Sequence, residues 1–472
     1  MIEDFSFFPV WKITQLIMKK EVSPVEVMSS CLEKISELNP QLNMFISVVN
    51  TEDAIRKAKV VEEKILRNEF SGYLGGIPVP VKDLTPTTDM GTTYGSLIRN
   101  EYIPSIDLAH ISKLKHSGAI VIGKTNTSEF GHKAITENRL LDPCRNPWDF
   151  SYVSGGSSGG SAASVASGIA SIAEGSDGGG SIRIPASFCG VYGIKPTNWI
   201  RFESRKSNLN LKDFSQFGFF ARDPRDLKLL FDKVFSDEIS DHKYNINDPI
   251  QLESKYKNLS SLKIAWIPDW GVSPVDSQIR SELENSVLAI EKFGASVDRF
   301  DYVFDELECR YAFATLFFRG LAHEYGSLLD RFRNDMTKSM IECVEFGREI
   351  SDGEYVQAIE SMKLCRQKIK SIFDRYDLVL TPTTPIPSFE IDFPPSKIDG
   401  IGVDPNWAFN TFCYIFNMTG NPAMSIPCGY TKGLTILPFG LQAVARMGEE
   451  KTLIDFSVFL ELAWKLSENK PF

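Results

Sequence analysis

The chain has 472 residues, of which 43% are hydrophobic and 24% are charged, so it is long enough to bury a large core and has a globular composition. Its formal net charge is -10, which argues against nucleic acid or an anionic membrane as a partner, because both require clustered Lys and Arg. No apolar run reaches the ~18 residues of a membrane-spanning helix, and the acidic beginning MIEDF is unlike a secretory leader, so we expect a cytoplasmic protein.

The first half of the chain alternates helical and strand patterns. Residues 6–46 carry apolar side chains at helical spacing, with a helix start at 23–26. The segment 75–84 predicts a short strand, and 116–126 predicts a helix that leads into a buried strand. Small residues at helical spacing over 157–170 predict a tightly packed central helix. This alternation is typical of an α/β fold with a parallel or mixed sheet.

The second half begins with a polar, poorly periodic stretch at 235–262, which predicts a surface connector. A strand is expected at 262–266, a helix at 275–293, a long helical region at 305–373, and a strand at 378–380 that enters a proline-rich loop. No internal repeat is found. We therefore predict a single domain over residues 1–472, an α/β/α sandwich with a mixed central sheet.

The cysteines carry no site pattern. Eight are scattered along the chain without a CxxC pair, which is typical of neither a disulfide framework nor a structural zinc site. We expect reduced thiols and neither a metal nor an organic cofactor.

Glycine and serine dominate residues 152–197, but the segment also carries apolar residues that a flexible linker would lack. Glycine pairs occur at 155–156 and 159–160, and a triplet at 178–180. Glycine tolerates positive φ and has no Cβ, so several backbone N–H groups can converge on one point. That geometry suits an anion or a developing oxyanion, and predicts an active-site wall.

The motifs of this segment, GGSSGGS at 155–161 and GSDGGGSIRIP at 175–185, closely resemble those of the amidase signature hydrolases. The resemblance covers most of the chain, since it extends to GGIPVPVKDL (75–84), GKTNTSEFG (123–131), LVLTPTTP (378–385) and FNMTGNPAMSIPCG (416–429). It implies an amide C–N hydrolase whose small-molecule amide substrate is cleaved to an acid and ammonia or an amine.

In that family a lysine, a serine that follows a cis peptide bond, and a nucleophilic serine form the catalytic triad. The resemblance places these roles on Lys82, Ser157 and Ser181, and implies a cis bond between Gly156 and Ser157. A serine hydroxyl needs a base to remove its proton, and Lys82 can be that base only if burial lowers its pKa enough to leave the amine neutral. Ser157 would relay the proton.

The family pattern also assigns the loop around the nucleophile. Asp177 and Arg183 flank the loop and are expected to brace it without carrying protons. The predicted oxyanion hole consists of the backbone N–H groups of Gly178, Gly179, Gly180 and Ser181.

The residues alone leave other interpretations open. G-x-S-x-G at 155–159 is also typical of a nucleophile elbow, which would need a downstream histidine, either His242 or His323. A phosphate-binding loop is a second interpretation, but this sequence lacks the lysine that such a loop would have directly after GGSSGG. A non-catalytic binding or scaffolding protein is a further alternative. The presence of all three residues of the triad argues against it.

The substrate is less defined by the sequence. The family includes acylamidases, peptide amidases, lactam-oligomer hydrolases and the glutaminase subunit of a tRNA-dependent amidotransferase, which is the main alternative. We favour a free enzyme, because residues 346–365 lack the basic, glycine-containing pattern expected for glutamine recognition. Whether the chain forms a homodimer stays open. Two roles also stay open for the aromatic residues of the 407–416 segment, which could line an apolar acyl pocket or pack in the core. These residues are Trp407, Phe409, Phe412, Tyr414 and Phe416.

Overall fold

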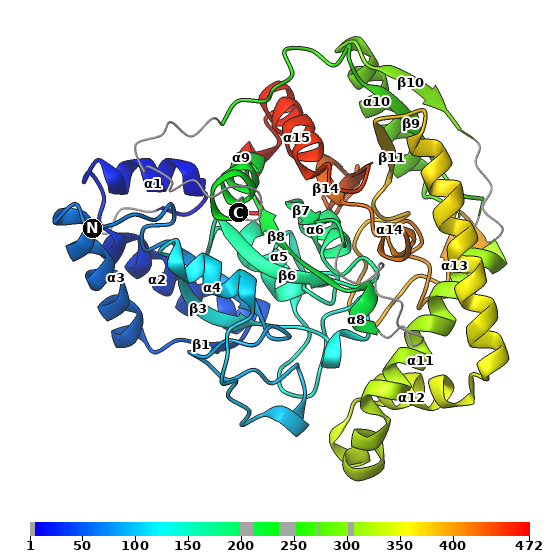
Figure 1. The fold of residues 1–472 in the computed structure, drawn as a ribbon, viewed down its shortest axis with the longest axis horizontal. Coiled ribbons are helices and arrows are strands. Elements are labelled where there is room, and N and C mark those ends of the chain that lie inside the picture. Colours follow the sequence, from blue (N-terminus) through cyan, green and yellow to red (C-terminus); the bar gives the residue numbers. More distant parts are fainter. Residues whose placement is uncertain (1–4, 199–210, 236–251, 272–273, 301–305) are drawn as a thin grey trace.

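A mixed sheet of eight strands runs through the middle of the molecule (Figure 1). The structure, a computed structural model, describes residues 5–198, 211–235, 252–271, 274–300 and 306–472. The β10–β9 and β9–β11 pairs are parallel and the other neighbouring pairs are antiparallel. In spatial order the strands are β10 (Ser296–Arg299), β9 (Lys263–Trp266), β11 (Leu378–Pro382), β15 (Pro438–Ala445), β14 (Ala423–Tyr430), β7 (Tyr192–Lys195), β8 (Gln216–Ala221) and β6 (Ile172–Asp177).

Helices cover both faces of this sheet. Consecutive side chains of a strand point to opposite faces, and Phe219 and Phe220 of β8 accordingly enter different buried clusters. Phe220 shares its cluster with α5 (Gly159–Ala166) and α6 (Arg183–Cys189), whereas Phe219 shares its cluster with α9 (Pro224–Leu229), α10 (Ser277–Lys292) and α15 (Glu450–Trp464). The predicted α/β/α sandwich with a mixed central sheet is therefore confirmed.

The central helix α5 consists of small residues, and all of its residues are buried. Gly160 shows why small residues are needed, since a Cβ there would come within 2.3 Å of the Met44 carbonyl oxygen and 2.5 Å of the Asn126 amide nitrogen. The backbone of α5 thus approaches its neighbours closely. The predicted packed helix is present, over a shorter range than the 157–170 that was expected.

A second, smaller sheet stands beside the main one, with strand order β1–β3–β2. Its edge strand β2 ends at Lys82, and β2 runs parallel to β3. One of the helices around it, α2, begins where a helix start was predicted, with Ser23 and Glu26 forming a capping box. The elements of this part are α1 (Val10–Met18), α2 (Pro24–Leu42), β1 (Phe45–Val48), α3 (Thr51–Leu66), β2 (Pro78–Lys82), α4 (Ala109–His116) and β3 (Ile120–Thr125).

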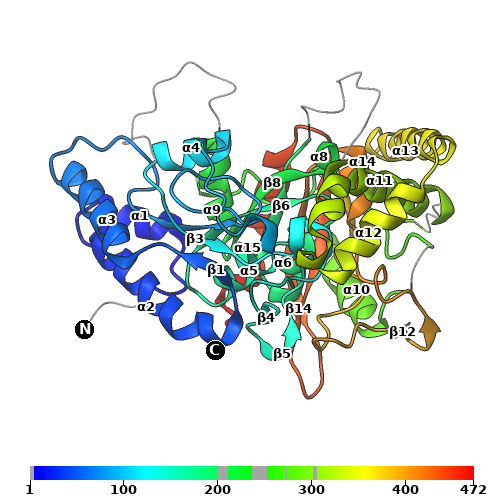
Figure 2. The same cartoon turned by 90° about the horizontal axis from the view of Figure 1, so that it is seen from below.

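The opposite end of the long axis is helical, as Figures 1 and 2 show. The long helical region predicted over 305–373 consists of α11 (Glu306–Phe332), α12 (Lys338–Glu349) and α13 (Asp352–Phe373). Thr337 and Ser351 cap the starts of α12 and α13 with their hydroxyls, so the region is broken at these positions. The remaining short elements are β4 (Arg145–Asn146), β5 (Asp149–Val153), α8 (Leu211–Phe214), β12 (Lys397–Ile398), β13 (Ile401–Gly402) and α14 (Tyr414–Thr419).

Most of the predicted surface connector, residues 236–251, lies outside the described residues. Within the described part of the chain, none of the helices has the length and apolar character that crossing a bilayer demands.

Candidate active site

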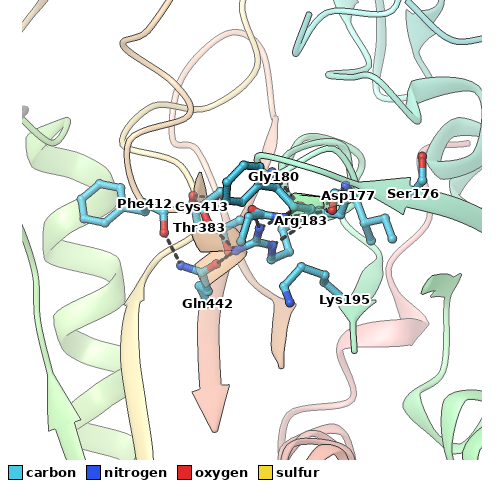
Figure 3. Close-up of polar contacts among 12 residues, drawn as sticks. Ser176, Asp177, Gly180, Arg183, Lys195, Thr383, Phe412, Cys413 and Gln442 are labelled. Atoms are coloured by element: carbon cyan, nitrogen blue, oxygen red, sulfur yellow. Dashed lines mark hydrogen bonds and ion pairs between the residues drawn. The ribbon is translucent and has the colours of Figure 1, made fainter. Parts of the chain in front are cut away.

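The loop that joins β6 to α6 is built around a buried ion pair between Asp177 and Arg183 (Figure 3). Asp177 is the last residue of β6 and Arg183 the first of α6, and both side chains are fully buried. The Arg183 Nε and Nη2 atoms donate to the two carboxylate oxygens at 2.9 Å each, in a bidentate contact. Burial has the largest single effect and would raise the pKa of Asp177, but the charge and hydrogen bonds of Arg183, together with the Lys195 charge and the Asn417 hydrogen bond, outweigh it and hold that pKa well below its usual range.

The remaining donors of Arg183 tie the loop to distant parts of the chain. Its Nη1 donates to the Cys413 carbonyl oxygen at 2.9 Å and to Gln442 Oε1 at 2.7 Å, and its Nη2 donates to Asn417 Oδ1 at 2.6 Å. Figure 3 shows Arg183 between Asp177 on one side and Gln442 and Cys413 on the other. Arg183 therefore links β6 to α14 and β15, and every one of its polar contacts is with buried groups.

The glycine triplet differs from prediction at one position. Gly180 has a φ of +117°, and a Cβ there would lie 2.6 Å from the Cys413 Cβ, so the conformation requires glycine. Its N–H donates to Asp177 Oδ1 at 2.7 Å, and is therefore occupied and not a free donor for an oxyanion. Within the described residues, the N–H groups of Gly178, Gly179 and Ser181 donate to no protein acceptor. The carboxylate that braces the loop thus removes Gly180 from the predicted set.

Lys82 and Ser157 meet at the base of this loop. The Lys82 Nζ atom lies 2.7 Å from Ser157 Oγ, and also donates to the carbonyl oxygen and hydroxyl of Ser176, at 3.2 Å and 3.1 Å. The peptide bond between Gly156 and Ser157 is cis, as the family resemblance implied. Lys82 is fully buried, and burial lowers its pKa to about 7 although the charges of Glu174 and Asp177 raise it.

Ser181 lies on the same cavity wall as Ser157 and Ser176. Its hydroxyl forms no hydrogen bond with any described residue, and the N–H of Ser158 donates to its carbonyl oxygen at 3.2 Å. We call Lys82, Ser157, Ser176, Ser181 and the Asp177–Arg183 pair the polar floor. The polar floor brings together residues from β2, the start of α5, and the β6–α6 loop.

A cavity of about 470 Å³ opens above the polar floor. Its walls come mainly from α11, α12, the segment 130–135 and the segment 405–410. Neighbouring rings touch one another, for example Phe318 with Trp407 at 6.0 Å and with Phe346 at 5.2 Å between centroids. We call the Phe and Trp residues of this lining the aromatic wall, namely Phe130, Phe313, Phe317, Phe318, Phe346, Trp407 and Phe409.

The structure decides which aromatic residues of the 407–416 segment face the cavity. Trp407 and Phe409 belong to the lining. Phe412, Tyr414 and Phe416 are at most 1% exposed, do not line the cavity and pack in the largest buried cluster. The segment therefore serves the cavity with its first half and the core with its second half.

The charged and titratable groups of the cavity lining are few. Lys133 donates to Glu137 at 2.5 Å, and Glu342 pairs with Lys338 at 3.7 Å on the surface of α12. His132 lines the cavity, but its ring nitrogens contact the Glu129 carbonyl oxygen and the Ser339 hydroxyl. Burial lowers the pKa of His132 to about 4, so its ring is neutral at pH 7.

Among the residues that the structure describes, no histidine downstream of Ser157 lies at this site, as a nucleophile elbow would require. His323 is exposed on α11 and is not part of the cavity lining, and His242 lies outside the described residues. The central serine of the G-x-S-x-G segment, Ser157, contacts Lys82 instead. Among the residues that the structure describes, no group of three or more His, Cys, Asp and Glu side chains is arranged to hold a metal ion.

Several residues of the site were not found from the sequence. Ser176 lies inside the glycine-rich motif, directly before Asp177, so its position in the sequence already indicates that it is near the site. Asn417 comes from the matching segment 416–429 and Gln442 from β15, but nothing local indicates that they are partners of Arg183. Glu174 accepts a hydrogen bond from the Lys82 backbone N–H at 3.0 Å, a contact between strands that spacing cannot reveal.

The comparisons with known proteins agree with one another, and each match covers most of the chain. The family model Amidase matches residues 26–454. The A subunit of glutamyl-tRNA(Gln) amidotransferase from Carboxydothermus hydrogenoformans is 31% identical over 98% of each chain. Among solved structures, a bacterial aryl acylamidase of the amidase signature family has a TM-score of 0.84 and 25% identity over 99% of this chain and 98% of its own. The corresponding amidotransferase protein of Thermotoga maritima has a TM-score of 0.72 and 26% identity over 95% of this chain and 94% of its own.

Proposed function

This chain belongs to the amidase signature family of amide C–N hydrolases, and we propose that it is a stand-alone amidase that cleaves amides with a large apolar or aromatic group through an acyl-enzyme at Ser181. The observation that carries this proposal is the aromatic wall, which encloses a cavity directly above Lys82, Ser157 and Ser181. A polar floor supplies the chemistry and an apolar wall the binding energy.

The reaction begins with proton transfer across two hydroxyls. A neutral Lys82 amine has one lone pair and two N–H donors, and the two oxygens of Ser176 accept from it. The lone pair then accepts the proton of Ser157, which in turn takes the proton of Ser181. The Lys82 pKa of about 7 supports this role, because an appreciable fraction of the amine is neutral at pH 7.

The attack of Ser181 on the amide carbon creates an oxyanion. In this proposal the N–H groups of Gly178, Gly179 and Ser181 receive it, since each is without a protein acceptor in the described part of the chain. A single donor of this kind contributes about 3 kcal/mol to transition-state stabilisation. Asp177 and Arg183 act as positioning residues, because their contacts hold the loop that presents these donors.

Collapse of the tetrahedral intermediate breaks the C–N bond. The leaving nitrogen takes the proton from Ser157, which recovers it from the Lys82 ammonium, so ammonia or an amine departs neutral. Water then attacks the acyl ester of Ser181 with the same groups as base, releasing the acid and restoring the serine. No charge accumulates on the enzyme over the cycle.

The aromatic wall is what favours an apolar substrate. Rings from α11, α12 and the 405–410 segment surround the space next to Ser181, and aromatic surfaces bind apolar and aromatic groups well. No arginine belongs to the cavity lining among the described residues, and Lys133 already donates to Glu137. The zwitterionic backbone of a free amino acid would find few partners here.

One observation favours a second candidate, the glutaminase subunit of a tRNA-dependent amidotransferase. The curated relatives are A subunits of glutamyl-tRNA(Gln) amidotransferases, at 31% to 32% identity. Against it stand the apolar cavity and the higher TM-score to the aryl acylamidase, 0.84 against 0.72. We therefore keep it as the alternative that the experiment must separate.

We also propose that residues 1–472 act as one domain. The cavity draws its lining from residues between Leu84 and Asn410, and the central sheet joins β6 to strands as late as β15. Cutting the chain between these parts would divide both the sheet and the cavity.

The test is a hydrolysis screen with anilides, aryl carboxamides, short aliphatic amides, cyclic amides, peptide amides and glutamine. We expect turnover of anilides or aryl carboxamides by the chain alone, and a Ser181→Ala variant that loses turnover by roughly 10⁴-fold or more while keeping its circular dichroism spectrum. Ser457→Ala is the matched control, since Ser457 is a buried serine of α15 that bonds only within its helix. Mass spectrometry should find the acyl group on the peptide that contains Ser181.

Glutamine hydrolysis that depends on added protein subunits would replace this proposal with the amidotransferase alternative. Retained amide hydrolysis by Ser181→Ala would remove the acyl-enzyme mechanism.

A further inference from the structure

A buried carboxylate, Glu174, contacts the backbone of Lys82 and does not line the cavity. Its Oε2 accepts from the Lys82 backbone N–H at 3.0 Å, and its Oε1 accepts from the Thr85 hydroxyl at 2.8 Å. His110 Nε2 lies 3.0 Å from the same Oε1. Glu174 is 0% exposed, and Thr85 and His110 are also buried. A carboxylate in such a place needs a reason, because burying a charge is costly unless it is well hydrogen-bonded.

Glu174 contacts the backbone N–H of Lys82 on the side of β2 that faces away from its strand partner β3. β2 is an edge strand of the small sheet, and among the described strands it pairs only with β3; Lys82 is its last residue. Glu174 belongs to β6 of the main sheet. The carboxylate therefore bridges the two sheets at the residue that carries the amine, and fixes where the side chain of Lys82 begins.

Glu174 is itself held on three sides. The His110 ring stacks on Phe217, with centroids 4.0 Å apart and planes within 2°. Thr85 follows β2 and its carbonyl oxygen accepts from the Lys124 ammonium. The main-chain oxygen of Glu174 accepts from Ser161 of α5 at 2.7 Å. The carboxylate is thus connected through His110 and Thr85 to α4, β8 and β3, and the Glu174 backbone is connected to α5, so the carboxylate is a well-anchored support.

Charged groups from β6 and β3 and a histidine from α4 surround Lys82 and Glu174. Glu174 and Asp177, both on β6, are the two charges that act on Lys82, and the contribution of Glu174 is the larger. From β3, Lys124 faces Glu174 and the neighbouring Asp83, and from α4 His110 contacts Glu174 directly. The charge of Glu174 favours the ammonium form of Lys82, in opposition to burial.

We propose that Glu174, held by His110 and Thr85, is a positioning residue for the proposed base Lys82, fixing its backbone at the end of β2 and supplying the main negative charge that balances its ammonium form. The proposal rests on the proposed function only in naming Lys82 as the base. It assigns a task to a glutamate, a histidine and a threonine that do not touch the cavity.

The charge is tested by a direct titration of Lys82 that does not require turnover. In protein with ¹³Cε-labelled lysine, the Lys82 resonance is assigned by its absence in Lys82→Met, and its titration midpoint is measured. Glu174→Gln keeps the shape and removes the charge, so we expect the midpoint to fall by about one pH unit or more. Glu461→Gln is the matched control, because Glu461 is a buried glutamate of the distant helix α15 that accepts a hydrogen bond from the Tyr192 hydroxyl. This substitution should leave the Lys82 midpoint unchanged.

The position is tested by kinetics. Glu174→Asp keeps the charge but draws the carboxylate one methylene back from the Lys82 N–H. We expect a kcat reduced by roughly tenfold or more with KM unchanged, and a Lys82 midpoint close to that of the unmodified protein. Where Glu174→Gln fails to fold, judged by circular dichroism and size exclusion, the Glu174→Asp result decides.

An unchanged Lys82 midpoint in folded Glu174→Gln, or an unchanged kcat in Glu174→Asp, would overturn the proposal. A shifted midpoint in an enzyme that hydrolyses no amide would leave it standing and remove the proposed function instead, so the two failures are distinguishable.

Discussion

The polar floor and the aromatic wall meet in one cavity but are held in place by different physics. In the floor, directed hydrogen bonds fix the buried groups, and Lys82, Asp177 and Arg183 are all 0% exposed. In the wall, rings from helices pack edge to face, and Phe346 is 53% exposed. Directional contacts fix atoms to a geometry, whereas apolar packing tolerates exchange of one large side chain for another.

This difference separates chemistry from selectivity. Changes in the floor should remove turnover or folding altogether, because no neighbouring residue can replace the proposed chemistry or the directed contacts of its groups. Changes in the wall should alter which amide binds and leave the chemical step intact. Substitutions in each region test this division, beginning with the floor.

The largest effect is expected at Lys82. Lys82→Met removes the proposed base from a buried site and should lower kcat by roughly 10³-fold or more, measured on the best anilide of the screen. Lys195→Met is the matched control, because Lys195 is also fully buried with a pKa lowered by burial to about 7, yet it donates to the Pro196 carbonyl oxygen and does not line the cavity. It should keep turnover within tenfold. Equal losses in both variants would show that a buried lysine as such, and not its contact with Ser157, matters.

The next effect concerns the stability of the floor. Arg183→Met leaves Asp177 buried without its charge partner, and breaking such a pair from one side costs about 3–5 kcal/mol of unfolding free energy. Urea denaturation of the variant and the unmodified chain measures it. An exposed pair provides the contrast, since Arg333→Met removes the Arg333–Glu345 contact on the surface, and solvent screens such a pair so strongly that the urea midpoint should barely move. Similar small changes in both would refute the view that the loop depends on its ion pair.

The pH dependence sharpens the same division. The neutral amine of Lys82 is the active form, and burial lowers its pKa to about 7. Protonation below that value inactivates the base, so kcat/KM should fall about tenfold for each pH unit below about 7 and level off above it. A pH profile from about 5 to about 9 measures this limb. Phe318→Ala should not move the limb, and a limb that follows a change in the wall would contradict the separation.

A smaller, selective effect is expected from the wall itself. Phe318→Ala removes a ring that contacts Trp407 and Phe346, and should raise KM for aryl amides by roughly tenfold with kcat little changed. A short aliphatic amide should lose much less. Phe300→Ala is the control, since Phe300 packs on Tyr376 away from the cavity. A fall in kcat at constant KM would mean that the wall takes part in the chemical step.

The smallest effect is expected from the charge in the lining. Lys133→Met removes a partly exposed ammonium that donates to Glu137, and pairs of this kind contribute little energy. With a neutral aryl amide as substrate, kcat/KM should stay within about twofold. A larger loss would indicate that the cavity binds a negatively charged group.

Much of the molecule could be predicted from the sequence, because local patterns carried the information. Periodicity predicted the helical region that became α11, α12 and α13, and the strand that became β9. Small residues predicted the packing of α5, since only glycine, alanine and serine permit such close approach. The motifs that resemble the amidase signature predicted the family, and indicated Lys82, Ser157 and Ser181 as the candidates for the triad.

Other features were decided only by the tertiary structure, because they depend on contacts between residues far apart in the chain. Gly180 is assigned to Asp177 by the fold of the loop and not by the presence of glycine. The boundary between Phe409 in the cavity and Phe412 in the core follows from how the segment packs against α6, and periodicity cannot reveal it. Glu174 meets the backbone of Lys82, 92 positions earlier, only because β6 and β2 lie side by side. The amino-acid sequence determines which groups are available, and packing determines which of them meet.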